Sequence, residues 1–193
     1  MRIKYNAPTV LTYAFLCALV VLFSGRLIPR LAEDWFMVSG RGTFSPASLR
    51  DWITIITHAA GHASWGHLAA NFSIILLIGP MLEENYGSIP LLVMILITSA
   101  VTGLLNVVFF ITSLMGASGV AFMMILLASF TNFSRGEIPI TFILVLVFFI
   151  GEQLVKSFNS DNISYFAHIA GGFCGSLFGF FFPPQKRIMK KEK

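Results

Sequence analysis

Hydrophobic residues fall into six long runs along this chain, with shorter polar stretches between them. A helix needs about 20 mostly apolar residues to cross the hydrocarbon layer of a membrane, with about 17 to 25 allowed. Six segments approach this length and predict membrane-spanning helices at residues 9–23, 65–82, 89–111, 117–130, 139–155 and 165–182. We therefore expect an all-α polytopic membrane protein that folds as one domain over residues 1–193.

The composition strengthens this prediction. Of 193 residues, 56% are hydrophobic and only 11% are charged, whereas a soluble domain carries about 25% charged residues. Too few polar side chains remain to cover a water-exposed globule. The two cysteines, Cys17 and Cys174, both fall in apolar runs, so we interpret them as buried thiols rather than a disulfide.

The formal net charge of +4 comes largely from the two ends of the chain. The basic residues at these ends are Arg2, Lys4, Lys186, Arg187, Lys190, Lys191 and Lys193. Because Lys and Arg close to membrane spans stay on the cytoplasmic side, both tails, residues 1–8 and 183–193, are predicted to be cytoplasmic. This requires an even number of spans. The pattern does not indicate nucleic acid, although the C-terminal cluster could also attract anionic lipid.

The first connection, at about residues 25–64, is the only long one predicted. Trp35 and Trp52 lie in it and Trp65 follows it, and these are all the tryptophans of the chain. Indole rings prefer the membrane–water interface, so this connection is predicted to lie half-embedded in the outer surface. Since no small-x-small cleavage site follows the first run, we expect an uncleaved span rather than a signal peptide.

Polar side chains inside membrane spans are costly and usually mark function. They occur here at His67 and Asn71 in the second span, Ser118 in the fourth and His168 in the sixth. With the predicted topology, each of these spans begins at the outer face, so all four residues lie at a similar depth. Residues far apart in the sequence are thus expected to meet near the outer surface.

Ser118 lies between Gly116 and Gly119 where the fourth helix begins. A serine there could simply cap the helix. A serine and a histidine at one depth, however, are the minimum for nucleophilic catalysis, with Ser118 as nucleophile and His168 as base. No motif connects an acid, such as Glu152 or Asp161, to the histidine, so a dyad is the simplest interpretation.

Other residues would support this pair. His168 is followed by Gly171 and later glycines, which allow two membrane helices to approach closely. His67 and Asn71 are four residues apart, share a helix face and can donate hydrogen bonds to an oxyanion. Phe122, one turn after Ser118, could pack against the imidazole.

A metal site is the sharpest alternative to a dyad. His58 and His62 have the four-residue spacing of many metal ligands, but no Asp or Glu lies near them, and the chain has only four histidines. We therefore expect neither a metal nor another cofactor. His62 is off the face shared by His67 and Asn71, and we place it in the preceding loop.

Together these residues resemble the rhomboid family over most of the chain, from Trp52 to Gly179. The resemblance rests on four motifs, namely His62-x4-His67-x3-Asn71, Gly116-Ala117-Ser118-Gly119, Ala167-His168-x2-Gly171-x3-Gly175 and Gly79-x3-Glu83-x3-Gly87-Ser88. It implies an intramembrane serine protease that cuts membrane-spanning substrates near the outer boundary through an acyl-enzyme. Neither metal nor ATP would be needed.

The resemblance also implies roles for single residues. Ser118 would be the nucleophile and neutral His168 its general base. The Ser118 backbone N–H, Asn71 and His67 would hold the oxyanion, His62 would support the site, and Glu83 would be structural. Two features differ from many relatives. Phe122 stands where a tyrosine is common, and Asp51-Trp52 lacks a following arginine.

Two other functions compete with proteolysis. One is a catalytically inactive rhomboid-like protein that binds membrane clients, and the other is a small transporter. The inactive relative usually lacks the serine or the histidine, and the broken midplane helices of transporters are not evident. Span five and residues 158–164 are our prediction for a substrate gate, and a bacterial inner membrane is the expected location. The sequence does not identify the substrate, its cleavage site or the oligomeric state.

Overall fold

The structure is a computed structural model that describes residues 4–130 and 163–182, with residues 140, 143–145, 147, 148 and 184. Its named helices are α1 (Pro8–Arg26), α2 (Leu31–Trp35), α3 (Leu49–Thr57), η1 (His58–Ala60), α4 (Trp65–Tyr86), α5 (Ser88–Phe109), α6 (Ser118–Ser129) and α8 (Ile163–Phe181). The described residues include no strand, only an isolated antiparallel bridge between Val38 and Leu114. The fold is therefore all-helical, as expected.

Five of the six predicted spans correspond to helices α1, α4, α5, α6 and α8. By length and composition, α4 and α5 are long and apolar enough to cross a membrane, while the other three contain shorter apolar stretches. The fifth predicted span, residues 139–155, lies largely outside the described residues, as do Glu152, Asp161 and most of the predicted gate. The number of six spans therefore stays a prediction.

Polar residues lie inside the bundle and apolar residues cover its outside. On α5, Thr98, Thr102 and Asn106 are buried, whereas Leu77 of α4 and Phe181 of α8 are 79% and 73% exposed. Such a surface is unfavourable in water because it leaves apolar area exposed, but it suits a hydrocarbon environment. The distribution agrees with an integral membrane protein.

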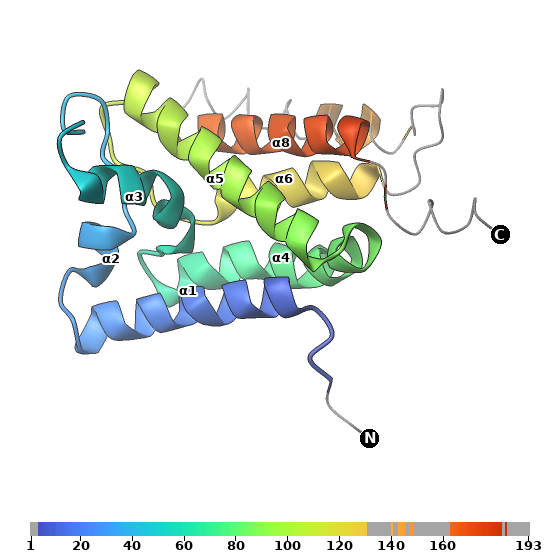
Figure 1. The fold of residues 1–193 in the computed structure, drawn as a ribbon, viewed down its shortest axis with the longest axis horizontal. Coiled ribbons are helices and arrows are strands. Elements are labelled where there is room, and N and C mark those ends of the chain that lie inside the picture. The colour runs from blue at the N-terminus through green and yellow to red at the C-terminus, as the bar shows by residue number, and fades with distance from the viewer. Residues whose placement is uncertain are drawn as a thin grey trace.

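Helix α6 lies at the centre of the bundle, between α4 and α8 (Figure 1). Seven of its twelve residues are buried, including Met123, Met124 and Leu127. At about 1.5 Å per residue it is about 18 Å long, shorter than the hydrocarbon layer of about 30 Å. A helix of this length would not cross the hydrocarbon layer by itself.

The long first connection is more ordered than the sequence indicated. It contains α2, α3 and η1, and α3 buries Asp51 and Thr54 against the bundle while Trp52 is 50% exposed. Ser48 caps α3 by accepting a hydrogen bond from the Asp51 N–H. Trp35 and Trp65 are also exposed, as expected of indole rings at a membrane interface.

Glu83 connects the end of α4 to the start of α1. Its carboxylate accepts hydrogen bonds from the Thr9 and Val10 N–H groups at 2.8 and 3.0 Å and so satisfies two free donors at the start of α1. Glu83 is buried near the end of α4. The predicted span ended at residue 82, but α4 continues through Glu83 and Glu84 to Tyr86. Gly87, with φ of +92°, then connects α4 directly to α5.

Candidate active site

Ser118 is the first residue of α6, and the N-cap position is Ala117. The interpretation of Ser118 as the helix cap is therefore wrong, because Ala117 occupies the cap position and its side chain makes no capping hydrogen bond. The free N–H groups and the positive end of the helix dipole lie at this point. The position favours negative charge that develops next to the Ser118 hydroxyl.

The chain before Ser118 turns sharply at Gly116, whose φ is +133°. A Cβ atom on Gly116 would lie 2.8 Å from Cε1 and 2.9 Å from Nε2 of His67, and 3.7 Å from Nδ2 of Asn71. Only glycine combines this backbone conformation with such a close approach. The α4 side chains His67 and Asn71 therefore lie directly against the segment that presents Ser118.

Four hydrogen bonds hold this segment in place. Leu114 and Val38 exchange backbone hydrogen bonds of 3.0 Å, and the Gly116 N–H donates to the His58 carbonyl at 2.9 Å. Asn106 Nδ2 donates to the Thr112 carbonyl at 3.1 Å. The first connection and α5 thus fix the backbone that leads to the proposed nucleophile.

Helices α6 and α8 touch through their backbones. A Cβ on Gly171 would lie 2.0 Å from the Gly119 carbonyl oxygen, and one on Gly175 would lie 2.2 Å from that of Met123. Glycine is required at these points because no larger side chain fits between the helices. The first turn of α6, which begins with Ser118, therefore packs on the part of α8 that carries His168.

The His168 ring stacks on Phe122, with ring centroids 4.2 Å apart and an interplanar angle of 29°. Tyr165 approaches the same imidazole edge-on, with centroids 6.3 Å apart. Aromatic contacts of this kind contribute about 0.5–1.5 kcal/mol beyond area burial. The imidazole of His168 is thus oriented by rings from both α6 and α8.

Asn71 supplies a hydrogen-bond donor that the folded chain does not use. The residue is buried, and Nδ2 has no hydrogen-bond partner among the described residues. His67 lies one helical turn before it, and its N–H donates to the Ser64 hydroxyl at 3.1 Å. An unpaired buried donor costs about 1–3 kcal/mol, which is understandable where an oxyanion is to be bound.

His62 lies in the loop before α4, as predicted, but it contacts the site more closely than its spacing indicated. Its ring packs edge-on against His67 at 5.1 Å, and its Nε2 accepts a hydrogen bond from the Ala117 N–H at 3.4 Å. Burial has the larger effect and the nearby His67 the smaller one, and together they lower the pKa of His62 to about 4. A neutral ring is required, because a protonated Nε2 could not accept this hydrogen bond.

His58 was considered from the sequence only as a metal ligand, and its structural contacts were missed. Nδ1 lies 3.0 Å from the Ile55 carbonyl and Nε2 lies 3.4 Å from the Thr102 hydroxyl. Burial lowers the pKa of His58 to about 4. The part of the chain that the structure describes holds no group of three His, Cys, Asp or Glu side chains suited to a metal ion. No local sequence pattern marks His58 as the link between α3, α5 and Gly116, because Thr102 and Gly116 are distant from it in sequence.

The arrangement provides the Ser118 hydroxyl at a helix N-terminus and the His168 imidazole on the neighbouring helix. The side chains of Asn71 and His67 lie against the loop before Ser118. These are the parts that nucleophilic acyl transfer requires. Gly116, Gly119, Phe122 and Gly171 all lie at contacts between these parts. The catalytic roles of Ser118, His168, Asn71 and His67 stay predictions.

Comparison with known proteins gives a consistent picture. Residues 49–185, more than two thirds of the chain, match the rhomboid domain family. The chain is 27% identical over 128 residues to Rhomboid protease GlpG of Haemophilus influenzae, which covers 65% of this chain and 67% of that protein. It is 22% identical over 162 residues to Rhomboid-like protein 11, chloroplastic, of Arabidopsis thaliana, which covers 75% of this chain and 58% of that relative.

Proposed function

The chain belongs to the rhomboid family, and from this we propose that it is an intramembrane serine protease. It would hydrolyse peptide bonds in or near the membrane-spanning segments of other proteins. The observation that carries the proposal is the backbone contact between Gly119 and Gly171, together with the stacking of Phe122 on His168. The proposed nucleophile and base are neighbours of these contacting residues.

The reaction would follow the course of a serine acyl transfer. Neutral His168 takes the proton of the Ser118 hydroxyl while its oxygen attacks the scissile carbonyl carbon. The carbonyl oxygen becomes negative and is stabilised by the Ser118 backbone N–H, Asn71 and His67. His168 then gives its proton to the leaving amine, and the acyl group stays on Ser118.

Water completes the cycle. His168 removes a proton from a water molecule, the hydroxide attacks the acyl-enzyme, and Ser118 regains its proton as the product carboxyl is released. No metal or other cofactor takes part in the proposed chemistry.

The proposed topology rests on the predicted spans and on the basic residues at the two ends of the chain. We propose a single six-helix domain over residues 1–193, with residues 1–8 and 183–193 cytoplasmic and about 25–64 in the outer interfacial region. The proposed location is a bacterial inner membrane, with the site near its outer face. The exposed tryptophans of the first connection support this placement.

The proposal is tested with purified protein, a single-span model substrate and a fluorophosphonate probe that labels active serines. Wild type is expected to cut the substrate and to take up the probe, while Ser118→Ala does neither and His168→Ala loses at least 100-fold in rate. Ser129→Ala is the matched control, because among the described residues its hydroxyl bonds only the Ile125 carbonyl within α6, and it should cut at the wild-type rate.

Other outcomes would replace the proposal. Cleavage that survives Ser118→Ala means that the proposed nucleophile is wrong. Folded wild type that neither cuts several substrates nor reacts with the probe, but still retains the substrate on co-purification, would favour an inactive client-binding protein.

A further inference from the structure

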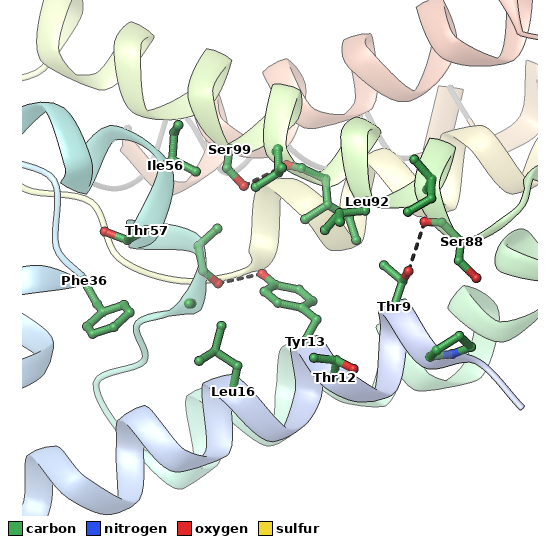
Figure 2. A pocket seen from close by; sticks show the side chains of 16 residues that line it. Thr9, Thr12, Tyr13, Leu16, Phe36, Ile56, Thr57, Ser88, Leu92 and Ser99 are labelled. Carbon is green, nitrogen blue, oxygen red and sulfur yellow. Dashed lines mark hydrogen bonds between the residues drawn. The ribbon is translucent and has the colours of Figure 1, made fainter. Parts of the chain in front are cut away.

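A second feature of the bundle lies between α1 and α5. A cavity of about 470 Å³ opens between α1 and α5, beneath α3 and η1. Its floor is formed by buried residues such as Ala60 and Ile95, whereas Leu16 and Leu92 at its rim are 47% and 40% exposed. Figure 2 shows Leu16 on α1 and Leu92 on α5, with Tyr13 between them in this view. We call this cavity the α1–α5 groove.

We propose that the α1–α5 groove binds one acyl chain of a membrane phospholipid. The proposal is independent of the proposed protease activity. It rests on the chemistry of the groove wall, on its dimensions and on the charge at its mouth.

The wall offers hydrocarbon and few free polar groups. The Tyr13 hydroxyl donates to the Ala59 carbonyl at 2.7 Å, and the Thr9 hydroxyl donates to the Ser88 carbonyl at 3.0 Å. The Ser99 hydroxyl likewise donates to the Ile95 carbonyl of its own helix at 2.8 Å. Figure 2 shows these three bonds within the wall. A polar ligand would lose its hydration and gain little in return, whereas an alkyl chain has no hydration to lose.

The length of the groove corresponds to one leaflet. It extends along α1 from Pro8 to Leu16 and along α5 from Ser88 to Ser99, which is about 12–16 Å at about 1.5 Å per residue. Half of a hydrocarbon layer of about 30 Å is about 15 Å. The groove therefore begins at the N-terminus of α1 and extends about halfway along α1 and α5, to the point where Ile56 and Ala60 line it.

The dimensions of the groove suit an acyl chain. A cavity of about 470 Å³ that extends along two helices has room for a single extended alkyl chain.

The mouth of the groove suits a phospholipid headgroup. Lys4 is exposed and lies four residues before Pro8, which lines the mouth. A Lys close to the membrane surface attracts anionic headgroups with about 1 kcal/mol. The acyl chain would thus enter from the leaflet that contains the N-terminus of α1, and its headgroup would stay next to Lys4.

The test uses a phosphatidylglycerol with a diazirine near the end of one acyl chain, as a minor component of vesicles that contain the full chain. After photolysis, the labelled residues are mapped by peptide mass spectrometry. We expect saturable labelling within residues 8–16 and 88–99, at about one lipid per protein. Ser118→Ala should be labelled like wild type, so a failure of the protease proposal does not affect the result.

Two variants fill the groove from opposite walls. Leu92→Trp and Leu16→Trp should each lower labelling of the groove at least fivefold. The matched control is Leu77→Trp, because Leu77 is 79% exposed on α4 and does not line the groove; it should leave this labelling unchanged.

Three results would overturn the proposal. Labelling could be no stronger in the groove than on the outer face of α4, or it could respond equally to Leu77→Trp and Leu92→Trp. It could also disappear when a single-span peptide is added at low concentration, which would assign the groove to a transmembrane helix instead.

Discussion

Asn71 and Asn106 are both buried asparagines, but their amide groups have different surroundings. Nδ2 of Asn71 has no partner among the described residues, while Nδ2 of Asn106 donates to the Ser39 and Thr112 carbonyls at 3.4 and 3.1 Å. Asn106 Oδ1 is also unpaired among the described residues, so the two residues differ in their Nδ2 donors: that of Asn71 is unused, and that of Asn106 holds loops together. This contrast allows a catalytic role to be separated from a structural one.

We predict that Asn71→Ala lowers kcat by about 100- to 1000-fold, the usual cost of removing one oxyanion donor. Its thermal unfolding midpoint should change little, because its Nδ2 bonds to none of the described residues. Asn106→Ala should instead lower the unfolding midpoint, since two carbonyls lose a donor at about 1 kcal/mol each. The two variants are compared by substrate cleavage and by thermal unfolding in detergent. Equal loss of stability in both would assign a structural role to Asn71.

Phe122 provides a second test at the level of single residues. The ring stacks on His168, and such a contact contributes about 0.5–1.5 kcal/mol. We therefore predict that Phe122→Ala lowers kcat about 2- to 12-fold with little change in KM, because the imidazole is less well oriented. Phe122→Tyr keeps the ring and should stay within about twofold of wild type. A change in KM alone would mean that Phe122 binds substrate rather than orienting the base.

At the level of elements, the contact between α6 and α8 depends on glycine. A methyl group at Gly171 would overlap the Gly119 carbonyl, so the helices would have to move apart, and overpacking of this kind costs about 1–3 kcal/mol or more. We predict that Gly171→Ala lowers the unfolding midpoint and reduces fluorophosphonate labelling of Ser118 at least tenfold.

The control for this prediction is Gly66→Ala in the first turn of α4. Its nearest neighbour for a new Cβ is the Ser64 hydroxyl at 3.8 Å, so there is room for the methyl group. Because Ala is favoured over Gly in helices by about 0.5–1 kcal/mol, this variant should be as stable as wild type or slightly more stable. Normal labelling in Gly171→Ala would show that the α6–α8 spacing does not position Ser118.

The sequence predicts which elements exist better than where they end. The apolar run of the second span indicated an end near residue 82, because Glu83 and Glu84 follow it. In the structure α4 continues to Tyr86, since the Glu83 carboxylate is buried against the N–H groups of Thr9 and Val10. These partners are more than 70 residues away, so no local pattern could reveal them. The short helices α2 and α3 were missed because they were taken as part of one interfacial loop.

At the level of the whole molecule, topology brings distant residues to one end of the bundle. The order of the apolar runs was enough to predict that His67, Asn71, Ser118 and His168 lie at a similar depth. It could not predict which backbones touch, because the bridge from Val38 to Leu114 and the bond from Gly116 to His58 depend on packing rather than on composition. The predicted site residues thus came from the sequence, and the segments that hold them in place came from the structure.

The whole fold should also be sensitive to acid through His58 and His62. Burial lowers the pKa of both to about 4, compared with about 6.5 in an unfolded chain. Above pH 6.5 both states are neutral, and stability does not depend on these groups. As pH falls from 6.5 towards 4, the unfolded state takes up protons that the folded state excludes, so the free energy of unfolding decreases by up to about 1.4 kcal/mol per pH unit for each histidine. Below about pH 4 the folded state is protonated as well, and the loss levels off.

This loss is best measured between pH 7.5 and 5.5, above the range in which ordinary carboxylates take up protons. At pH 5.5 a fully buried histidine should cost about 1.4 kcal/mol, which lowers the unfolding midpoint of a chain of this size by about 3–6 °C. In His58→Gln the midpoint at pH 7.5 should be lower, because the contacts to Ile55 and Thr102 are altered, but its decrease towards pH 5.5 should be smaller than in wild type. If wild type and His58→Gln lose the same number of degrees over this range, His58 does not carry the acid sensitivity. The His58 carbonyl also accepts a hydrogen bond from the Gly116 N–H. If His58 moves when it is protonated, the loop before Ser118 should therefore be the first part of the site to change.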